Sequence, residues 1–150
     1  MSTREDTTFR LQYAVGRDIA APVATVWARL TDAPGFTAWN STVSSLEGEI
    51  ALGQRLKLQV PIAPGRTFKP KVVAMEDGRT MVWQDGFFPM FQGTRTFTLS
   101  PTDTGTRFEM VEVFRGMMLP MIKGSLPDFR DPFDQFAADL ATICEADAAG

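Results

Sequence analysis

The chain of 150 residues, 44% apolar and 22% charged, has the size and composition of a single globular domain, which excludes disordered and fibrous classes. A net charge of −3, with basic residues scattered along the chain, argues against nucleic-acid binding. Histidine is absent, which excludes Ser-His and Cys-His nucleophile pairs and histidine-based metal sites. We expect no metal ion and no cofactor.

No targeting signal and no membrane-spanning segment are expected. Residues 1–6 are polar, so no signal peptide is expected, and no stretch approaches the roughly 18 apolar residues of a membrane span. A cytoplasmic location is therefore expected. The single cysteine, Cys144, excludes an internal disulfide and is expected to be a buried, inert thiol.

The first quarter of the chain predicts one strand followed by two short helices. Apolar residues alternate along a strand at Phe9, Leu11, Tyr13, Val15 and Ile19. Pro22 suits the first turn of a helix, whose apolar stripe is Val23, Val26, Trp27 and Leu30. Pro34 ends this helix, and residues 36–40 are expected to add one helical turn. Residues 1–8 and 147–150 are expected to be flexible ends of one domain, residues 9–146.

Residues up to about 115 predict strands with short links, and hence an antiparallel sheet of about six or seven strands. One strand alternates at Leu56, Leu58, Val60 and Ile62. Asp77-Gly78 is a hairpin turn signal between residues 72–75 and 81–83. A two-residue turn points Val72 and Ala74 inward, whereas a one-residue shift points Lys71 and Val73 inward. Both registers remain open, and we expect Lys69 and Lys71 in solvent.

The turn at residues 102–105 fixes the register of the last hairpin. It places Leu99 opposite Phe108, Phe97 opposite Met110 and Arg95 opposite Glu112, all on one apolar face. A preceding hairpin closed around residues 88–91 sets Trp83 near Phe97 and Asp85 near Arg95. Arg95 is therefore predicted to lie between two carboxylates, because a charge on an apolar face requires a partner.

The last third of the chain predicts a helix over residues 132–146, with Asp131 as N-cap. One side of it is apolar and carries Phe129, Phe133, Phe136, Leu140, Ile143 and Cys144. This order of elements indicates an α+β fold. A single helix cannot cover a curved sheet completely, so we expect a cavity between helix and sheet.

Four segments match the pattern of a known family: Ile19-Ala20-Ala21-Pro22 with Val26-Trp27; Leu30-Thr31-Asp32 through Trp39-Asn40, then Glu47-Gly48 and Gly53; Trp83 with Gly93-Thr94-Arg95-Thr96-Phe97-Thr98-Leu99; and Gly105-Thr106-Arg107-Phe108 with Glu112-Val113-Phe114-Arg115-Gly116 and Pro120. Together they resemble the START-related helix-grip superfamily (SRPBCC), and within it the polyketide cyclase/dehydrase and lipid transport family. The resemblance covers residues 9–146. It implies a curved antiparallel sheet wrapped around a long C-terminal helix, with two short helices after the first strand.

The leading functional hypothesis is binding of a small hydrophobic ligand (a lipid, an aromatic polyketide-like molecule or an isoprenoid) in the cavity between sheet and helix. The candidate ligand-binding residues are Arg95, Trp83, Phe97, Phe108, Met110, Met81, Trp39, Phe133 and Phe136. Plain core packing is the alternative for each apolar member. Met117, Met118 and Met121 either line the cavity or fill the core. Arg95 either orients a ligand's polar head or belongs to a structural ion cluster.

Two other functions remain open. A cyclase or dehydratase would use a pocket carboxylate, Glu112 or Asp85, to move a proton. A protein-interaction module related to chaperone ATPase activators, which share the fold, would present a large apolar surface patch in place of a cavity. We expect a monomer or a homodimer.

Overall fold

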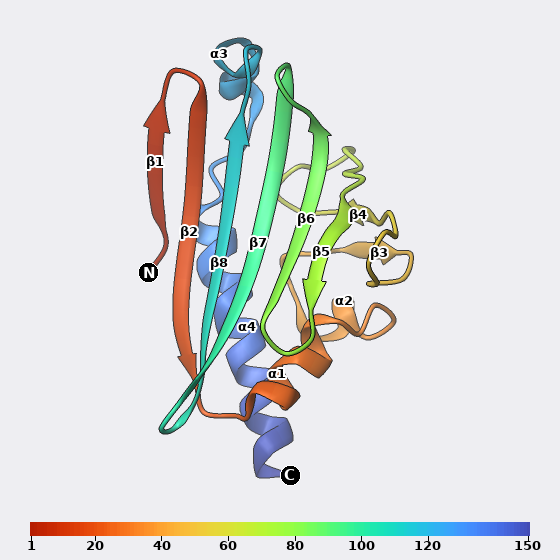
Figure 1. Ribbon diagram of the computed structural model, residues 1–150, viewed down its shortest axis with the longest axis vertical. Coiled ribbons are helices and arrows are strands. Elements are labelled where there is room, and N and C mark those ends of the chain that lie inside the picture. The colour runs from red at the N-terminus through yellow and green to blue at the C-terminus, as the bar shows by residue number, and fades with distance from the viewer.

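The computed structural model describes residues 1–150 and consists of a curved antiparallel sheet with a long helix, α4 (Arg130–Ala149), against one face (Figure 1). The sheet has six strands in the order β1-β2-β8-β7-β6-β5. They are β1 (Thr3–Thr7), β2 (Arg10–Ile19), β5 (Lys71–Glu76), β6 (Thr80–Phe87), β7 (Phe91–Thr102) and β8 (Gly105–Arg115). The predicted α+β architecture is confirmed.

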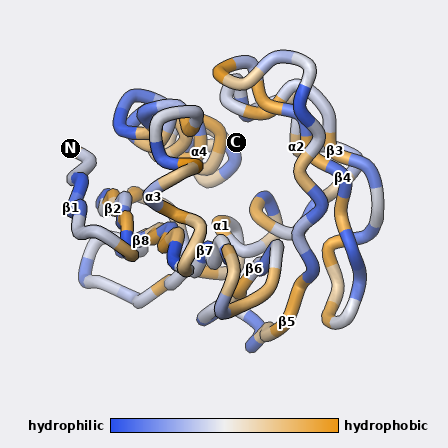
Figure 2. The backbone as a smooth tube through the Cα atoms, turned by 90° about the horizontal axis from the view of Figure 1, so that it is seen from above, coloured by the Kyte–Doolittle hydropathy of each residue, from blue (hydrophilic) through white to orange (hydrophobic).

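The remaining elements enclose the space between sheet and helix. The two predicted short helices are α1 (Val23–Leu30) and α2 (Phe36–Trp39). Near α2 lies a two-stranded sheet of β3 (Ser45–Glu47) and β4 (Lys57–Gln59). Seen from above, α4 lies on one side and the small sheet on the other, with β8, β7 and β6 below them (Figure 2). None of the helices combines the length and apolar character that a membrane span requires.

The strand predicted at residues 56–62 is shorter than expected. Only Lys57–Gln59 is a strand, and Ile62 lies exposed in the loop that follows. Pro61 explains the difference, because it lacks the N–H that a continuing ladder needs. The chain after β8 forms α3 (Leu119–Ile122) and a short 3₁₀ turn, Lys123–Ser125.

Both ends of the chain contain regular secondary structure. Residues 3–7 form an edge strand paired with β2 although all five are exposed, because backbone pairing at a sheet edge needs no apolar side chain. Phe9 occupies the turn between β1 and β2 and is exposed. At the other end α4 continues to Ala149, and Arg29 on α1 holds Asp147 through an ion pair of 2.6 Å.

The register of the last hairpin is confirmed: Arg95 pairs with Glu112, Phe97 with Met110 and Leu99 with Phe108. The register of β6 against β7 differs from the prediction by two residues. Trp83 pairs with Arg95 and Asp85 pairs with Gly93. The predicted inner face is kept, because a shift of two leaves every side chain on its original side.

The hairpin between β5 and β6 follows neither predicted register throughout. Glu76 pairs with Thr80, so the turn has three residues, and a bulge separates Val72 from Ala74. Val72 is therefore buried and Ala74 exposed, because the bulge reverses the alternation between them. The expectation of exposed side chains at Lys69 and Lys71 is confirmed.

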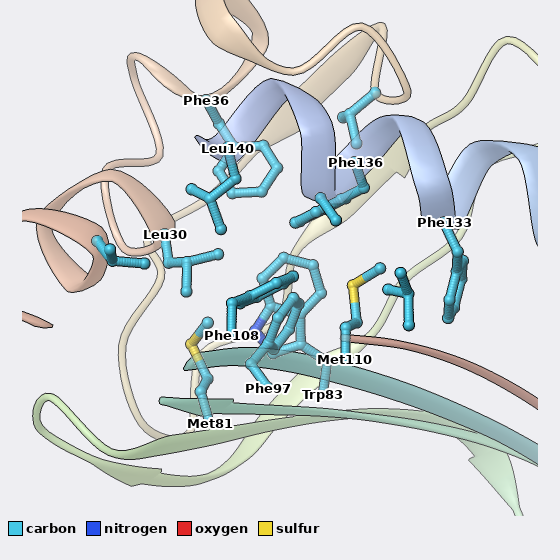
Figure 3. Packing of buried hydrophobic residues seen from close by; sticks show 14 of the residues in the cluster. Leu30, Phe36, Met81, Trp83, Phe97, Phe108, Met110, Phe133, Phe136 and Leu140 are labelled. Carbon is cyan, nitrogen blue, oxygen red and sulfur yellow. The ribbon is translucent and has the colours of Figure 1, made fainter. Parts of the chain in front are cut away.

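The predicted apolar side of α4 faces the sheet. Phe136 points from the helix into a group of aromatic rings, and Phe133 lies further along the helix, near Met110 (Figure 3). Ring centroids 5.7–6.1 Å from that of Phe136 belong to Phe36, Trp39, Phe97 and Phe108. The predicted N-cap at Asp131 is wrong. The helix begins at Arg130 with Phe129 at the N-cap position, and Asp131 lies within its first turn. Asp128, just before the cap, accepts a hydrogen bond from the Arg130 backbone N–H at 3.0 Å.

Candidate functional site

A cavity of about 90 Å³ lies between the sheet and the first half of α4. The sheet contributes Trp83, Asp85, Gly93, Arg95, Met110, Glu112 and Phe114. The helix and the residue before it contribute Phe129, Pro132, Phe133 and Phe136. The third wall comes from the chain around the small sheet: Thr42, Val43, Leu58, Val60, Ile62, Phe68 and Pro70. Ile62 is 38% exposed, so this third wall reaches the surface.

The periodicity of each element explains why these side chains converge. The residues from β6, β7 and β8 lie two apart along their strands and therefore share the inner face. Phe129, Phe133 and Phe136 are spaced by four and three residues, and Pro132 lies three after Phe129 and four before Phe136, so these residues lie along one side of the start of α4. The result is a mainly aromatic and aliphatic enclosure.

One ion pair lies inside this apolar enclosure. Arg95 Nε donates to Glu112 Oε1 at 2.9 Å, and the two side chains are only 19% and 12% exposed. The Arg95 guanidinium also lies 5.0 Å from the ring centroid of Phe133. No protein acceptor bonds either Nη nitrogen of Arg95, so those N–H donors remain free.

Burial raises the pKa of the Glu112 carboxyl group above its ordinary value. Arg95 opposes the shift by attraction and by its hydrogen bond, whereas the nearby charge of Asp85 adds to it. A carboxyl group in this setting takes up a proton more readily than an exposed glutamate does.

Asp85 does not form the predicted second ion pair with Arg95. Its carboxylate accepts hydrogen bonds from the backbone N–H of Lys69 at 3.1 Å and from that of Gly86 at 2.8 Å. The two-residue shift between β6 and β7 causes this difference, because it places Asp85 opposite Gly93. Through the bond to Lys69, Asp85 joins the segment that forms the third wall to β6. Arg95 therefore has Glu112 as its single carboxylate partner.

The predicted site residues divide into two groups. Those that line the cavity are Arg95, Trp83, Met110, Phe133, Phe136, Glu112 and Asp85. The others, Phe97, Phe108, Met81 and Trp39, are packed in the core beyond the cavity. They share its face or its end of the fold, but Phe36 and Leu30 from the short helices fill the space beside them (Figure 3).

The methionine prediction is wrong for two residues. Met117 and Met121 are 65% and 78% exposed and line no part of the cavity. Met118 is half-buried and also lies outside the cavity lining. These residues follow β8 at the end of the sheet, where the chain turns away from the space beneath α4.

Several lining residues were not predicted. Phe114 and Phe129 share the inner faces of their elements, so strand alternation and helical spacing contain the signal for both. In the third wall, strand alternation places Leu58, Val60 and Ile62 on one apolar face, but it does not show that this face meets α4. Val43 and Phe68 carry no such signal, because their placement depends on how the loops fold over α4.

Two further features bear on chemistry. The indole N–H groups of Trp83 and Trp39 are buried without a hydrogen-bond partner. Cys144 is fully buried, and burial raises the pKa of its thiol to about 12, so it is not poised as a nucleophile. No group of three or more Cys, Asp or Glu side chains is arranged to hold a metal ion.

Comparison with known families settles the relationship. The model of the family described as polyketide cyclase / dehydrase and lipid transport matches residues 10–145. The chain belongs to this family. The match extends over the whole sheet except β1 and over almost all of α4, so the cavity lies inside the family's shared fold. No curated protein sequence matches the chain.

Several solved structures share the fold at low sequence identity. A protein from Mesorhizobium loti aligns with a TM-score of 0.70 and 21% identity, covering 90% of this chain and 97% of its own. The di-domain ARO/CYC protein StfQ of the steffimycin biosynthetic pathway aligns with a TM-score of 0.74 and 14% identity, over 95% of this chain and 54% of its own. Norcoclaurine synthase from Thalictrum flavum, as a point mutant in complex with a transition state analogue, gives 0.71 and 12%, covering 95% and 99%.

Proposed function

We propose that the protein binds a small, largely apolar molecule carrying an anionic group such as a carboxylate, with that group hydrogen-bonded to Arg95. The observation that carries the proposal is the pair of free Nη donors on an arginine held inside an aromatic cavity. Glu112 fixes the guanidinium through Nε, which leaves the Nη edge free to bond an acceptor in two parallel hydrogen bonds.

The apolar walls determine the rest of the ligand. Met110, Phe114, Phe129 and Phe133 surround the polar pair, so an aromatic or aliphatic body gains by leaving water there. The family's description, covering polyketide cyclases and lipid transport, is consistent with a ligand of this kind. Lipids, aromatic polyketide-like molecules and isoprenoids with an acidic end all satisfy these requirements.

The cavity volume limits ligand size. About 90 Å³ is well below the roughly 300–1,000 Å³ of pockets that hold drug-sized ligands. A compact ligand fits with little change, whereas a larger one requires walls to move. Met110 is suited to this because its unbranched side chain adopts many shapes, and the loop bearing Val60 and Ile62 is tied to the sheet by few bonds.

Ligand binding is tested by native mass spectrometry of the purified protein and by shifts in melting temperature with paired ligands. Each pair consists of a fatty or aromatic acid and its methyl ester. We expect the acid to bind more tightly, and Arg95→Met combined with Glu112→Gln to abolish the difference without leaving an unpaired buried carboxylate. Arg107→Met is the matched control, because Arg107 lies on β8, the strand of Glu112, and its ion pair with Asp18 is exposed and outside the cavity.

Two results would overturn the proposal. One is the absence of any co-purified molecule together with unchanged melting temperatures across the panel. The other is equal affinity for acids and esters, which would mean that Arg95 serves only to neutralise Glu112.

A second candidate function is a cyclase or dehydratase reaction on a bound polyketide-like chain. The raised pKa of Glu112 favours it, because a general acid or base works best when its pKa lies near the working pH. The test is single-turnover conversion with candidate polyketide chains. Glu112→Gln should retain binding and lose turnover, and unchanged turnover would exclude Glu112 as the proton carrier.

A further inference from the structure

Large apolar side chains are exposed together at one end of the molecule. Of the ten exposed large hydrophobic residues in the chain, six belong to three segments that meet at this end. The segments are the β1–β2 turn, the β6–β7 turn and the chain from β8 into α3, all at the top of Figure 1. The six, here called the apolar tip, are Phe9, Phe87, Phe88, Met90, Met117 and Met121, with exposures from 39% to 78%.

The backbone holds these segments together. Gly116 N–H donates to Phe9 O at 3.2 Å, Met117 N–H to Pro89 O at 2.8 Å, and Met118 N–H to Met90 O at 2.9 Å. Gly116 has φ of +141°, and a Cβ there would lie 2.3 Å from Met90 O, so the close approach requires glycine. These hydrogen bonds and the close packing at Gly116 therefore hold the three segments of the tip in a defined arrangement.

The charges beside the tip that have no ion-pair partner are positive. A surface depression in it is lined by nine residues that include Arg10 and Arg115 and no carboxylate. The guanidinium of Arg115 lies 4.6 Å from the ring centroid of Phe88. At the edge of the tip, Lys123 Nζ bonds Asp6 at 2.6 Å and Thr7 O at 2.8 Å. The unpaired positive charges of Arg10 and Arg115 therefore lie together at the tip, although the whole chain has a net charge of −3.

We propose that the apolar tip docks on the surface of an anionic phospholipid bilayer. Aromatic and methionine side chains projecting from turns enter the boundary between headgroups and acyl chains together, and arginines beside them bond lipid phosphates. Arg10 and Arg115 flank the apolar side chains and so occupy the level of the headgroups when those side chains insert. Charge complementarity selects a phosphate-bearing surface as the occupant.

Docking of this kind is reversible and peripheral, because it uses side chains and no spanning segment. It is independent of the ligand proposed for the cavity, since none of the tip residues lines that cavity. The two proposals can therefore fail separately.

Co-sedimentation of the full chain with vesicles tests the docking. Vesicles of phosphatidylcholine alone are compared with vesicles that also contain phosphatidylglycerol. We expect the protein to bind only the vesicles that contain phosphatidylglycerol, and this binding should weaken as the salt concentration is raised. Arg10→Gln and Arg115→Gln should each lower the affinity for these vesicles about fivefold. Met117→Ser with Met121→Ser should also abolish it, since both side chains are largely exposed and their loss removes insertion without opening the core.

Matched controls lie away from the tip. Leu52→Ser removes an exposed apolar side chain of another loop, and Arg17→Gln removes an exposed arginine further along β2, so neither should alter vesicle binding. Equal melting temperatures of all variants check that folding is intact. Failure to bind either vesicle, or binding that the tip variants retain, would overturn the proposal. A concentration-dependent dimer that Met121→Ser dissolves, without vesicle binding, would overturn it in favour of a second copy of the chain.

Discussion

Replacing Phe133 with alanine tests whether the space between α4 and the sheet is a true cavity. Phe133 is 1% exposed, so burial alone predicts the loss of about 3–5 kcal/mol typical of a phenylalanine in a packed core. One side of this ring, however, faces a cavity of about 90 Å³, where it has fewer atoms to contact. We therefore expect the free energy of unfolding to fall by only about 2–3 kcal/mol, the loss of the Arg95 contact included.

Phe136 provides the comparison within the same helix. It also reaches the cavity, but four aromatic rings surround it within 6.1 Å, so its removal leaves more contacts unmade. Phe136→Ala should cost the full value of about 3–5 kcal/mol. Urea unfolding of both variants measures the difference in the free energy of unfolding. For a domain of this size, the melting temperature should fall by roughly 2–4 °C for each kcal/mol of stability lost.

The ordering of the two costs is the decisive result. A loss for Phe133→Ala equal to or greater than that for Phe136→Ala would mean that the cavity is filled in solution, and the reasoning from the cavity would fail. If the cavity exists, the enlarged space of Phe133→Ala should also accept a bulkier ligand than the wild type accepts.

Three further results are expected. The folded state binds the Glu112 proton more tightly than the unfolded state, so the free energy of unfolding should fall as pH rises from the ordinary pKa of 4.5 through the raised pKa. The melting temperature of Glu112→Gln should not show this dependence on pH. An unchanged dependence in that variant would mean that another group causes it. Cys144, with a thiol pKa of about 12, should react with a disulfide reagent only as fast as the protein unfolds, and immediate labelling would contradict its burial. Gly116→Ala should lower the free energy of unfolding by roughly 1–3 kcal/mol. Gly124→Ala should be nearly neutral, because a Cβ there meets nothing within 4 Å. Equal effects of the two variants in chemical denaturation would contradict the inference that the tip requires glycine at position 116.

The sequence predicts the sheet where local chemistry decides the structure. The turn at residues 102–105 fixes the register of β7 and β8 correctly, because a polar, glycine-containing link allows few ways to close. The turn after β6 is less restrictive: its residues Phe88, Pro89 and Met90 carry no comparable signal, and the prediction is two residues out. β1 is missed for a different reason, since a polar edge strand shows no alternation of apolar residues.

The sequence predicts which side chains lie on the inner face of the sheet, but not which of them line the cavity. Alternation places Phe97, Phe108, Arg95 and Glu112 on one face, as observed. Which of them meet open space depends on how far the short helices reach across that face. Phe36 and Leu30 fill one end and leave the other open, and long-range packing of this kind has no local signature.

The two-residue shift between β6 and β7 determines what Arg95 can do. In the predicted register, Asp85 and Glu112 would both bond the guanidinium, and an arginine saturated by two carboxylates has little left for a ligand. In the observed register Asp85 is bonded to the backbone of Lys69 and Gly86, and Arg95 contacts Glu112 through Nε alone. A half-buried cation whose Nη donors have no partner within the protein is costly for a folded protein unless something else satisfies those donors. Water reaching the cavity or an acidic ligand can do so, and only the ligand would make acids bind more tightly than their esters. That difference in affinity therefore distinguishes a structural ion pair from a recognition site.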